Sequence, residues 1–338
     1  MSTVRIGIIG AGRAGLLHAH SFATQVEDAA LIAVSDPSRE ALRHASTLYG
    51  VSTHSDYRDL LETDVDGVVV VTPTKFHAEI VRAAAEAGKH ILCEKPMAMN
   101  EDECESMIAA ARKARVKLQV GFMRRFDAGF RRAKELIDSG AIGEVVSVKA
   151  LTHGPSTPKP WMYDISASNG PLAEVSSHDI DAIRWLTGGE VESLYAMAGN
   201  FRSEQARHEW PDFYDSVLLS ARMSTGAMAL VDGAQGVRYG YDSRAEILGT
   251  SGRIDVGDLN ADRVVLHSGD GRSSRDIVAT WRDLYRDAYV AEARAFVQSI
   301  VEDSPPEVTG EDGLEAVRIV NAGNASIASG SIQHLGAR

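Results

Sequence analysis

Cysteine is almost absent from this chain of 338 residues, which contains only Cys93 and Cys104. Two cysteines are too few for a disulfide-rich scaffold, and so low a content is typical of proteins in a reducing compartment. The sequence begins with Met1-Ser2-Thr3 and passes directly into an apolar run, so we expect no signal peptide. Together these features predict a cytoplasmic protein.

Long apolar runs and an excess of positive charge are also missing. No stretch approaches the about 18 uninterrupted apolar residues that a transmembrane helix needs. The chain has 35 Lys and Arg against 47 Asp and Glu, which gives a net charge of −12. We therefore expect neither a membrane nor a nucleic acid among its partners. HExxH, paired cysteine clusters and G-x-S-x-G are absent, which argues against a metal site and against serine-hydrolase chemistry.

The N-terminal stretch carries the strongest motif in the chain. The β-branched run Val4–Ile9 leads into the pattern Gly10-x-Gly12-x-x-Gly15 and then into a segment that suits a helix. Strand, glycine turn and helix are the context that a dinucleotide-binding fingerprint needs. In that fingerprint Gly10 permits the tight turn, Gly12 lets the backbone approach a pyrophosphate, and Gly15 lets the helix pack closely on the strand.

An acidic residue stands where the fingerprint expects one. The second apolar run ends at Asp36, and the acid that bonds the ribose 2′-hydroxyl is expected about 20 residues after the last glycine. Asp36 would repel a 2′-phosphate, and Arg39 lies close enough to soften that repulsion, so we predict NAD in preference to NADP. The alternative is an ordinary glycine turn and an ordinary Asp, but three independent features agree against it. Further cofactor contacts are expected at Ala11, Arg13 and Ala14.

Strands and helices alternate through the first half. Further strands are expected at Gly67–Val71, His90–Cys93 and Lys117–Val120. Helices are expected to begin directly after the capping residues Ser38, Ser55 and Asn100. This alternation predicts an α/β Rossmann domain, a doubly wound parallel sheet, over residues 1–122. Ligands of such sheets bind at the carboxyl ends of the strands. The next cofactor candidates are therefore Thr72, Pro73 and His77, and then Glu94 and Lys95.

The position of Lys95 in the sequence indicates a role in catalysis. A lysine at the carboxyl end of a strand would lie near the nicotinamide and face the substrate. Pro96 fixes its own φ and favours an extended Lys95, which aims the side chain. The alternative is a surface lysine before a turn. Beside a dinucleotide site we favour a functional role.

The second half, residues 123–338, has a different pattern. Alternating strands predict an α+β domain with a large, mostly antiparallel open sheet that binds substrate and forms oligomers. The strands expected are Glu144–Thr152, Val191–Gly199, Ser216–Ser224 and Ala227–Ala234. Two helices, about Asp283–Val301 and Gly310–Ser329, close the chain and could pack back on the first domain. The polar loop His153–Gly170 is interpreted equally well as a substrate lid or as a surface or subunit-contact loop.

One predicted helix, Pro171–Leu186, collects ionisable residues. Glu174, His178 and Asp181 recur at i, i+4 and i+7 and would share one face. A carboxylate one turn from a histidine can orient its ring and stabilise its protonated form. Read alone, the segment favours a solvated acidic face with one satisfied histidine, and a metal site is the weakest alternative.

The predicted sheet has two apolar faces. Val217, Leu219, Ala221 and Met223 alternate with a more polar set that Leu218 interrupts. Few helices are available in this half to cover both faces, and a large exposed apolar surface usually marks an interface. We predict a homodimer through this sheet, which could pair again into a homotetramer. The alternative is a monomer whose loops and terminal helices cover the sheet.

Across nearly its whole length the chain resembles the family that includes glucose–fructose oxidoreductase and inositol 2-dehydrogenase. Its motifs look most like those of the inositol dehydrogenases. The stretches that carry the resemblance are Gly10–Gly15, Asp36, Val71–Pro73, Cys93–Pro96, Gly121–Asp127, His178–Asp181 and Tyr239–Asp242. The resemblance implies that Lys95 and His178 are catalytic, that Arg124 contacts the cofactor, and that Arg125, His153 and Tyr241 contact substrate hydroxyls. Glu174 stands where the family usually has Asp.

The resulting expectation is an NAD-dependent dehydrogenase of a cyclic polyol or sugar. His178 would be the base that removes the hydroxyl proton, and Lys95 would stabilise the developing negative charge on that oxygen. Glu174 would hold the His178 ring in register, so Lys95, Glu174 and His178 would all contact substrate. Two alternatives stay open, an NAD-dependent glycosidase of the same family and a non-catalytic NAD-sensing regulator.

Overall fold

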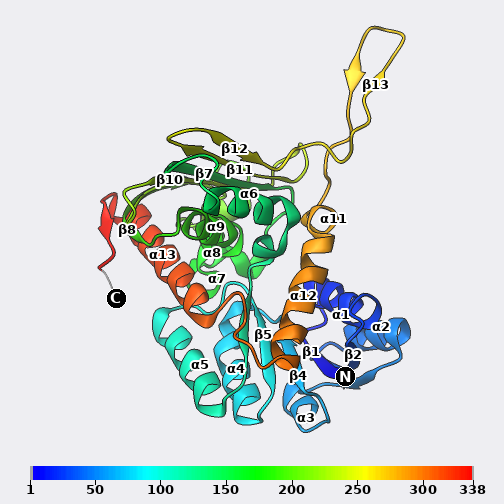
Figure 1. The fold of residues 1–338 in the computed structure, drawn as a ribbon. Coiled ribbons are helices and arrows are strands. Elements are labelled where there is room, and N and C mark those ends of the chain that lie inside the picture. Colours follow the sequence, from blue (N-terminus) through cyan, green and yellow to red (C-terminus); the bar gives the residue numbers. More distant parts are fainter. Residues whose placement is uncertain (1–2, 337–338) are drawn as a thin grey trace. The chain divides into compact units, whose positions relative to one another are not determined.

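The computed structural model describes residues 3–336, which form two compact units (Figure 1). Unit 1 contains the chain as far as Phe126 together with residues 287–317. Unit 2 contains Asp127–Arg286 and the residues from Arg318 onward. None of the helices in the described part of the chain has the length and apolar character of a membrane span.

Unit 1 is built on a six-stranded parallel sheet, as the alternating pattern predicted. Its strand order is β3-β2-β1-β4-β5-β6, and every neighbouring pair is parallel. Strand β1 lies between β2 and β4, so the winding reverses direction there, and such a reversal is where doubly wound sheets bind ligands. The strands are β1 (Val4–Ile9), β2 (Ala29–Ser35), β3 (Ser52–His54), β4 (Gly67–Val70), β5 (His90–Glu94) and β6 (Leu118–Gly121).

Polar side chains cap three helices of unit 1. The predicted caps Ser38 and Asn100 are confirmed, because their side chains accept N–H bonds from Ala41 and Glu103. The cap predicted at Ser55 is wrong, since the carboxylate of Asp56 caps that helix instead. The helices are α1 (Arg13–Thr24), α2 (Arg39–Tyr49), α3 (Tyr57–Leu61), η1 (Thr74–Phe76), α4 (His77–Glu86), α5 (Glu101–Ala114) and η2 (Met123–Phe126).

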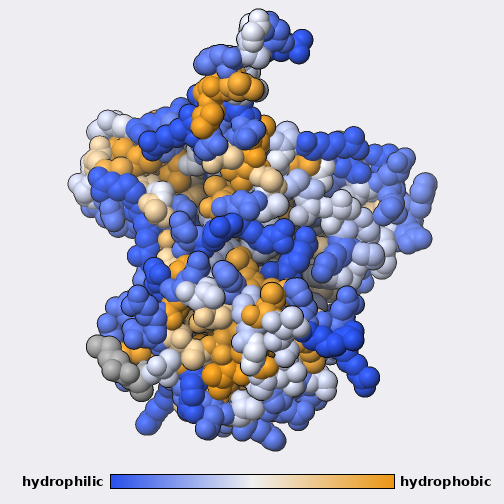
Figure 2. All heavy atoms as spheres, turned by 90° about the vertical axis from the view of Figure 1, so that its right-hand side faces the viewer, coloured by the Kyte–Doolittle hydropathy of each residue, from blue (hydrophilic) through white to orange (hydrophobic). Residues whose placement is uncertain are grey.

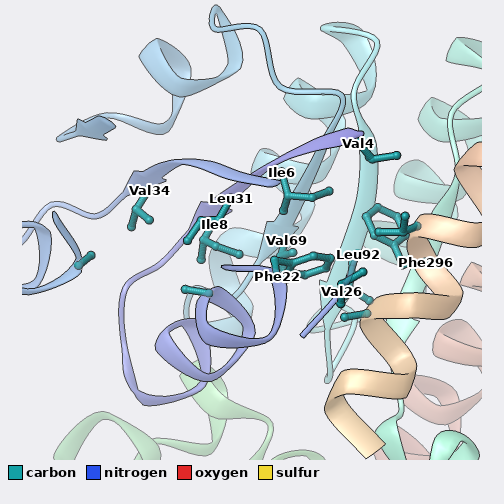
Figure 3. Packing of buried hydrophobic residues seen from close by; sticks show 14 of the residues in the cluster. Val4, Ile6, Ile8, Phe22, Val26, Leu31, Val34, Val69, Leu92 and Phe296 are labelled. Carbon is teal, nitrogen blue, oxygen red and sulfur yellow. The ribbon is translucent and has the colours of Figure 1, made fainter. Parts of the chain in front are cut away.

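A helix from late in the chain completes the core of unit 1. Phe296 of α12 (Arg286–Val301) packs with Phe22 of α1 and with Ile6 and Ile8 of β1 (Figure 3). Burying aromatic and aliphatic side chains of this size stabilises by about 1.5–3 kcal/mol each. Helices α1 and α12 therefore cover the same face of the sheet, although they lie far apart in the sequence.

Unit 2 is built on a seven-stranded mixed sheet of order β12-β11-β7-β10-β9-β8-β15. All neighbouring pairs are antiparallel except β7 and β10, which run parallel. The hairpin predicted between the third and fourth strands is confirmed, with Gly226 in its turn at φ 86°. The strands are β7 (Val145–Gly154), β8 (Val191–Gly199), β9 (Ser216–Met223), β10 (Met228–Gln235), β11 (Asp242–Gly249), β12 (Arg253–Val256) and β15 (Gln333–His334).

Helices cover one face of this sheet (Figure 1). Leu172 and Leu219 pack around Gly323 of α13, which joins this helix to the covered face. The helical segments are α6 (Ala128–Asp138), η3 (Pro160–Tyr163), α7 (Ile165–Ser168), α8 (Gly170–Glu174), α9 (Ser177–Thr187), α10 (Ala206–Glu209), α11 (Trp281–Leu284) and α13 (Gly310–Ser329).

The prediction of one continuous helix over Pro171–Leu186 is wrong. Helix α8 ends at Glu174, and α9 begins at Ser177. The junction residue Ser176 is fully buried against Gly233 of β10, where an added Cβ would lie 2.1 Å from its Oγ. The helix breaks because the chain comes this close to a sheet position that has no side chain.

The opposite face of the sheet and a projecting hairpin expose apolar side chains. Met197, Leu218 and Met228 are 55, 43 and 54% exposed on that face. A two-stranded hairpin, β13 (Leu266–His267) with β14 (Ser273–Ser274), projects from unit 2 (Figure 1). It carries apolar surface, seen at the top of Figure 2. The expectation of a dimer depends on the exposed face of the sheet, not on this hairpin.

Candidate functional site

The glycine turn of unit 1 has the geometry of a dinucleotide loop. Gly10 has a φ of 107°, and an added Cβ there would lie 2.6 Å from the carbonyl oxygen of Val71. An added Cβ on Gly15 would lie 1.8 Å from the oxygen of Gly10, so only glycine allows α1 to approach the strand this closely. Gly12 has open space within 4 Å of its Cβ position. The loop therefore leaves room for a pyrophosphate at the N-terminus of α1.

Asp36 is fixed beside this loop. Its Oδ2 accepts the backbone N–H of Ala11 at 2.8 Å, and its Oδ1 accepts the N–H of Ser38 at 2.8 Å. Each oxygen keeps a second lone pair that can accept a ribose hydroxyl. Arg13 is the first residue of α1 and Arg39 is the first residue of α2, and both side chains are exposed. The residues present thus fit NAD.

The turn after β4 and the segment after β5 are joined by His77. Its ring is buried, with Nδ1 2.9 Å from the carbonyl oxygen of Pro96 and Nε2 2.8 Å from that of Thr72. Burial lowers the pKa of His77, although hydrogen bonds to the two carbonyls oppose the shift. Because both ring nitrogens face protein carbonyls, His77 ties these two turns together.

Lys95 follows directly from the buried end of β5. Its backbone N–H donates to Oε2 of Glu94 at 3.0 Å, and the Lys95–Pro96 peptide bond is cis. Oε1 of Glu94 lies 2.9 Å from Nε2 of His18 on α1. Burial opposes ionisation of Glu94, but the hydrogen bond to His18 and the charge of Lys95 outweigh it and lower the pKa of Glu94. Glu94 therefore holds the backbone at Lys95 in place.

Two neighbouring arginines lie on η2, immediately after β6. Arg124 is 1% exposed, an unusual degree of burial for an arginine. Nη2 of Arg125 forms an ion pair with Oδ1 of Asp312 at 2.7 Å. Asp312 also accepts the backbone N–H of Thr309. Arg124 is thus buried within unit 1, and Arg125 is paired there with Asp312.

His178 and Glu174 lie on the two sides of the helix break in unit 2. Glu174 is the last residue of α8, and His178 is the second residue of α9 and 6% exposed. Asp181 is also buried, 3.9 Å from Nη1 of Arg184, which pairs with Glu190 at 2.6 Å. The interpretation of this segment as a solvated acidic face is therefore wrong.

The predicted substrate residues of unit 2 lie on different faces of its sheet. Tyr241 is buried, its ring stacks edge-on against Tyr285 at 6.4 Å, and the Cβ position of Gly154 lies 3.9 Å from its ring. By strand alternation these groups lie on the face that α8 and α9 cover.

His153 lies on the opposite face. Its Nε2 is 2.9 Å from Oδ1 of Asp232, and its Nδ1 is 2.5 Å from the hydroxyl of Tyr239. Asp232 precedes Gly233, the residue that faces the α8–α9 junction, so its own side chain projects away from those helices. Unit 2 thus brings Glu174, His178 and Tyr241 to one face of the sheet and His153 to the other.

Sequence reasoning missed several residues around these positions. Asp232 and Tyr239 hold His153. Asp232 belongs to no motif, and Tyr239 lies in the stretch Tyr239–Asp242 that carries the resemblance but was given no role of its own. His18 and Glu292 approach Glu94 from α1 and α12. The position of His18, three residues after Gly15 on the helix that follows the fingerprint, was the only available signal for it. Nothing in the sequence marks Glu292, which looks like an ordinary helix glutamate.

Comparison with known proteins identifies the family. Residues 4–122 match the oxidoreductase family with an NAD-binding Rossmann fold, and residues 130–255 match the GFO/IDH/MocA C-terminal domain. The chain belongs to the GFO/IDH/MocA oxidoreductase family. The resemblance inferred from the motifs is confirmed.

Full-length relatives refine this assignment. The chain is 34% identical to a myo-inositol 2-dehydrogenase of Thermotoga maritima, with 96% of each chain covered. It is 32% identical to an NAD-dependent scyllo-inositol 2-dehydrogenase of Bacillus subtilis, with 97 and 95% covered. A crystal structure of scyllo-inositol dehydrogenase from Lactobacillus casei, with bound NAD(H) and scyllo-inositol, superposes with a TM-score of 0.90 at 27% identity, covering 98 and 99%. The protein is therefore an NAD-dependent dehydrogenase acting on CH–OH groups, similar to inositol 2-dehydrogenases.

Proposed function

We propose that this member of the GFO/IDH/MocA family oxidises a secondary hydroxyl of a cyclic polyol or sugar, of the inositol class, to a ketone. The relatives named for inositol oxidation support this substrate class. The observation that carries the proposal is the position of Lys95. Its backbone is held by Glu94 at the carboxyl end of β5, in the sheet whose first strand leads into the dinucleotide loop. A cation there meets the oxygen of a substrate presented to the nicotinamide.

Lys95, His178 and Glu174 have different roles in the oxidation of the substrate hydroxyl. NAD, when bound, supplies the acceptor for the hydride that leaves the ring carbon. The ammonium of Lys95 stabilises negative charge as it develops on the oxygen. His178 accepts the hydroxyl proton, and Glu174, which lies one turn before it across the helix break, orients its ring.

The remaining site residues are assigned according to the half of the chain in which they lie. We assign cofactor binding to residues 1–122 with Arg124, and substrate binding to residues 123–338. Tyr241 and Arg125 are assigned to substrate hydroxyls. His153 lies on the other sheet face from His178 and Tyr241, so its assignment to substrate hydroxyls rests on the family resemblance alone.

A substrate panel tests the function directly. The protein is incubated with NAD and with inositol stereoisomers, hexoses and their glycosides, and NADH is followed by its absorbance. We expect NADH release from at least one free cyclic polyol or sugar without bond cleavage. Turnover only of a glycoside, with release of its leaving group and no net NADH, would contradict the proposal. So would tight NAD binding without turnover of any compound in the panel.

Assembly belongs to the same proposal. The outer face of the unit 2 sheet exposes Met197, Leu218 and Met228. Met197 of β8 is paired with Leu218 of β9, and Met228 of β10 is paired with Arg222 further along β9. We propose that a second copy of the chain covers this face in a homodimer, which can pair again into a tetramer.

A further inference from the structure

Three buried ionisable side chains meet inside unit 1. They are His18 on α1, Glu94 at the end of β5 and Glu292 on α12, and one polar atom of each lies within 4.8 Å of the other two. His18 and Glu292 are 0% exposed. The three elements are distant in the sequence and converge only in the folded chain.

Glu292 is the unusual member of this cluster. Neither carboxyl oxygen has a hydrogen-bond partner within the described residues. Burial, and then the negative charge of Glu94, raise the pKa of Glu292 well above its ordinary value. A buried carboxylate without a partner is very costly, whereas a protonated carboxyl needs only an acceptor for its O–H.

Acceptors for that proton lie within the cluster. Each oxygen of Glu94 uses one lone pair, on His18 or on the backbone N–H of Lys95, and keeps another. Nδ1 of His18 is buried without a hydrogen-bond partner in the described chain. A neutral Glu292 can thus donate its proton to the Glu94 carboxylate or to the His18 imidazole.

We propose that Glu292 is a protonated acid that shares its proton with the His18–Glu94 pair and so fixes the Glu94 carboxylate that anchors the backbone of Lys95. Glu292 is then a positioning residue for the reaction, acting through Glu94 on Lys95. This inference rests on the function proposed for Lys95.

The groups that surround the cluster favour a protonated, neutral Glu292 over an ionised one. The Tyr289 ring stacks edge-on against His18 at 5.3 Å, and the side-chain amide of Gln119 donates to the backbone oxygen of Glu292 at 3.2 Å. Other titratable groups that interact with Glu94 include Lys95, Cys93 and His77. Of these, Lys95 contributes a positive charge that lowers the pKa of Glu94, and its backbone N–H donates to Oε2 of Glu94.

A metal ion is the competing occupant of such a cluster. Two ligands of a tetrahedral ion, each about 2.1 Å from it, stand roughly 3.4 Å apart. Nε2 of His18 and Oε1 of Glu94 are 2.9 Å apart, which is the separation of a hydrogen bond. This distance indicates a proton between the two atoms.

Two substitutions at one position separate these possibilities. Glu292→Gln keeps a neutral donor, and Glu292→Leu keeps the volume without a donor. Glu302→Gln, an exposed position just after the same helix, is the matched control. With NAD and the best substrate of the panel, we expect kcat of the Leu variant to fall about 10- to 100-fold while the KM for NAD is unchanged. The Gln and control variants should stay near wild type.

Two readouts do not depend on turnover. The infrared difference spectrum of wild type against Glu292→Gln should show the C=O stretch of a protonated carboxylic acid at neutral pH. The ring ¹⁵N resonances of His18 should change in the Leu variant and stay close to wild type in the Gln variant. If Lys95→Ala keeps activity while these signals appear, the function proposed for Lys95 fails and the shared proton stands.

Other outcomes overturn the inference itself. The absence of the carboxylic-acid band would mean that Glu292 is ionised. A Gln variant as inactive as the Leu variant would mean that the charge of Glu292 is required. Stoichiometric metal in wild-type protein, lost in Glu292→Gln, would assign the cluster to an ion. Wild-type kcat and unchanged His18 resonances in the Leu variant would show that no proton is shared.

Discussion

Replacing Glu292 by Gln should stabilise the protein by an amount that grows with pH. The substitution preserves the size of the side chain and a neutral donor, and it removes only the ability to release a proton. Glu292 is fully buried, and its pKa in the folded protein is raised well above 4.5 by burial and by Glu94. The effect on the free energy of unfolding follows from proton linkage.

The sign and size of the effect are fixed by the number of protons bound. Above about pH 4.5 the unfolded chain has released the Glu292 proton, whereas the folded protein still holds it. Wild-type stability from this group is therefore fully present below the unfolded pKa and is lost as the pH rises through the folded pKa. The loss is about 1.4 kcal/mol for each pH unit in this window. The Gln variant lacks this loss, so it should gain that amount over wild type per pH unit.

Thermal unfolding followed by circular dichroism measures this difference. Midpoints of wild type, Glu292→Gln and Glu302→Gln are compared in half-unit steps from about pH 5.5 upward. For a chain of 338 residues, whose entropy of unfolding is about 0.7 kcal/mol/K, we expect the gap between Glu292→Gln and wild type to widen by about 2 °C per pH unit. The depressed pKa of Glu94 adds stability that is lost as the pH falls, but all three proteins share it and it cancels.

The control decides what a positive result means. Glu302 is exposed, so its Gln variant should stay parallel to wild type at every pH. A gap for Glu292→Gln that is constant with pH would refute the reasoning, because Glu292 would then have the same charge folded and unfolded. A gap that narrows as the pH rises would reverse the sign and show that the folded state prefers the carboxylate.

The remaining predictions concern the reaction, the cofactor and the assembly. Lys95→Ala and His178→Ala should each lower kcat by about 10²–10⁴-fold while NAD binding, followed by fluorescence titration, persists. His178→Ala should also lose the acidic limb of the rate–pH profile for oxidation, and Glu174→Ala should lose less; near wild-type turnover in either alanine variant would reject its catalytic role. The carboxylate of Asp36 should favour NAD over NADP by more than about 100-fold in kcat/KM, because two unit charges 4 Å apart near a surface repel by about 4 kcal/mol; equal values would contradict the assignment. Light scattering should give a mass of at least twice 36.4 kDa, and Leu218→Lys on the outer sheet face should move it toward 36.4 kDa; a monomeric wild type would show that the chain covers its own sheet.

Features written in short stretches of sequence were predictable. The fingerprint glycines, Asp36, and the caps Ser38 and Asn100 depend on groups within a few residues or on a fixed spacing. Strand and helix periodicity depends on the same local order. Such features are decided by backbone geometry and by the burial of one face, so a single sequence contains them.

Features that depend on packing between distant segments were not predictable. The break between Glu174 and Ser177 exists because Ser176 meets Gly233, a residue on another strand. The parallel pairing of β7 with β10 requires a crossover that no local pattern marks. The facing of His153 toward Asp232, away from the helices, also became known only with the register of the sheet.

Glu292 shows this division most clearly. The sequence by itself determined a dinucleotide-binding domain, its cofactor and a lysine at the end of β5, because each is encoded in contiguous residues. Only the tertiary structure decided that a helix from late in the chain brings a glutamate to His18 and Glu94. The physical reason is that the charge state of a carboxyl depends on the solvent and partners removed around it. That environment is complete only after all three elements have packed.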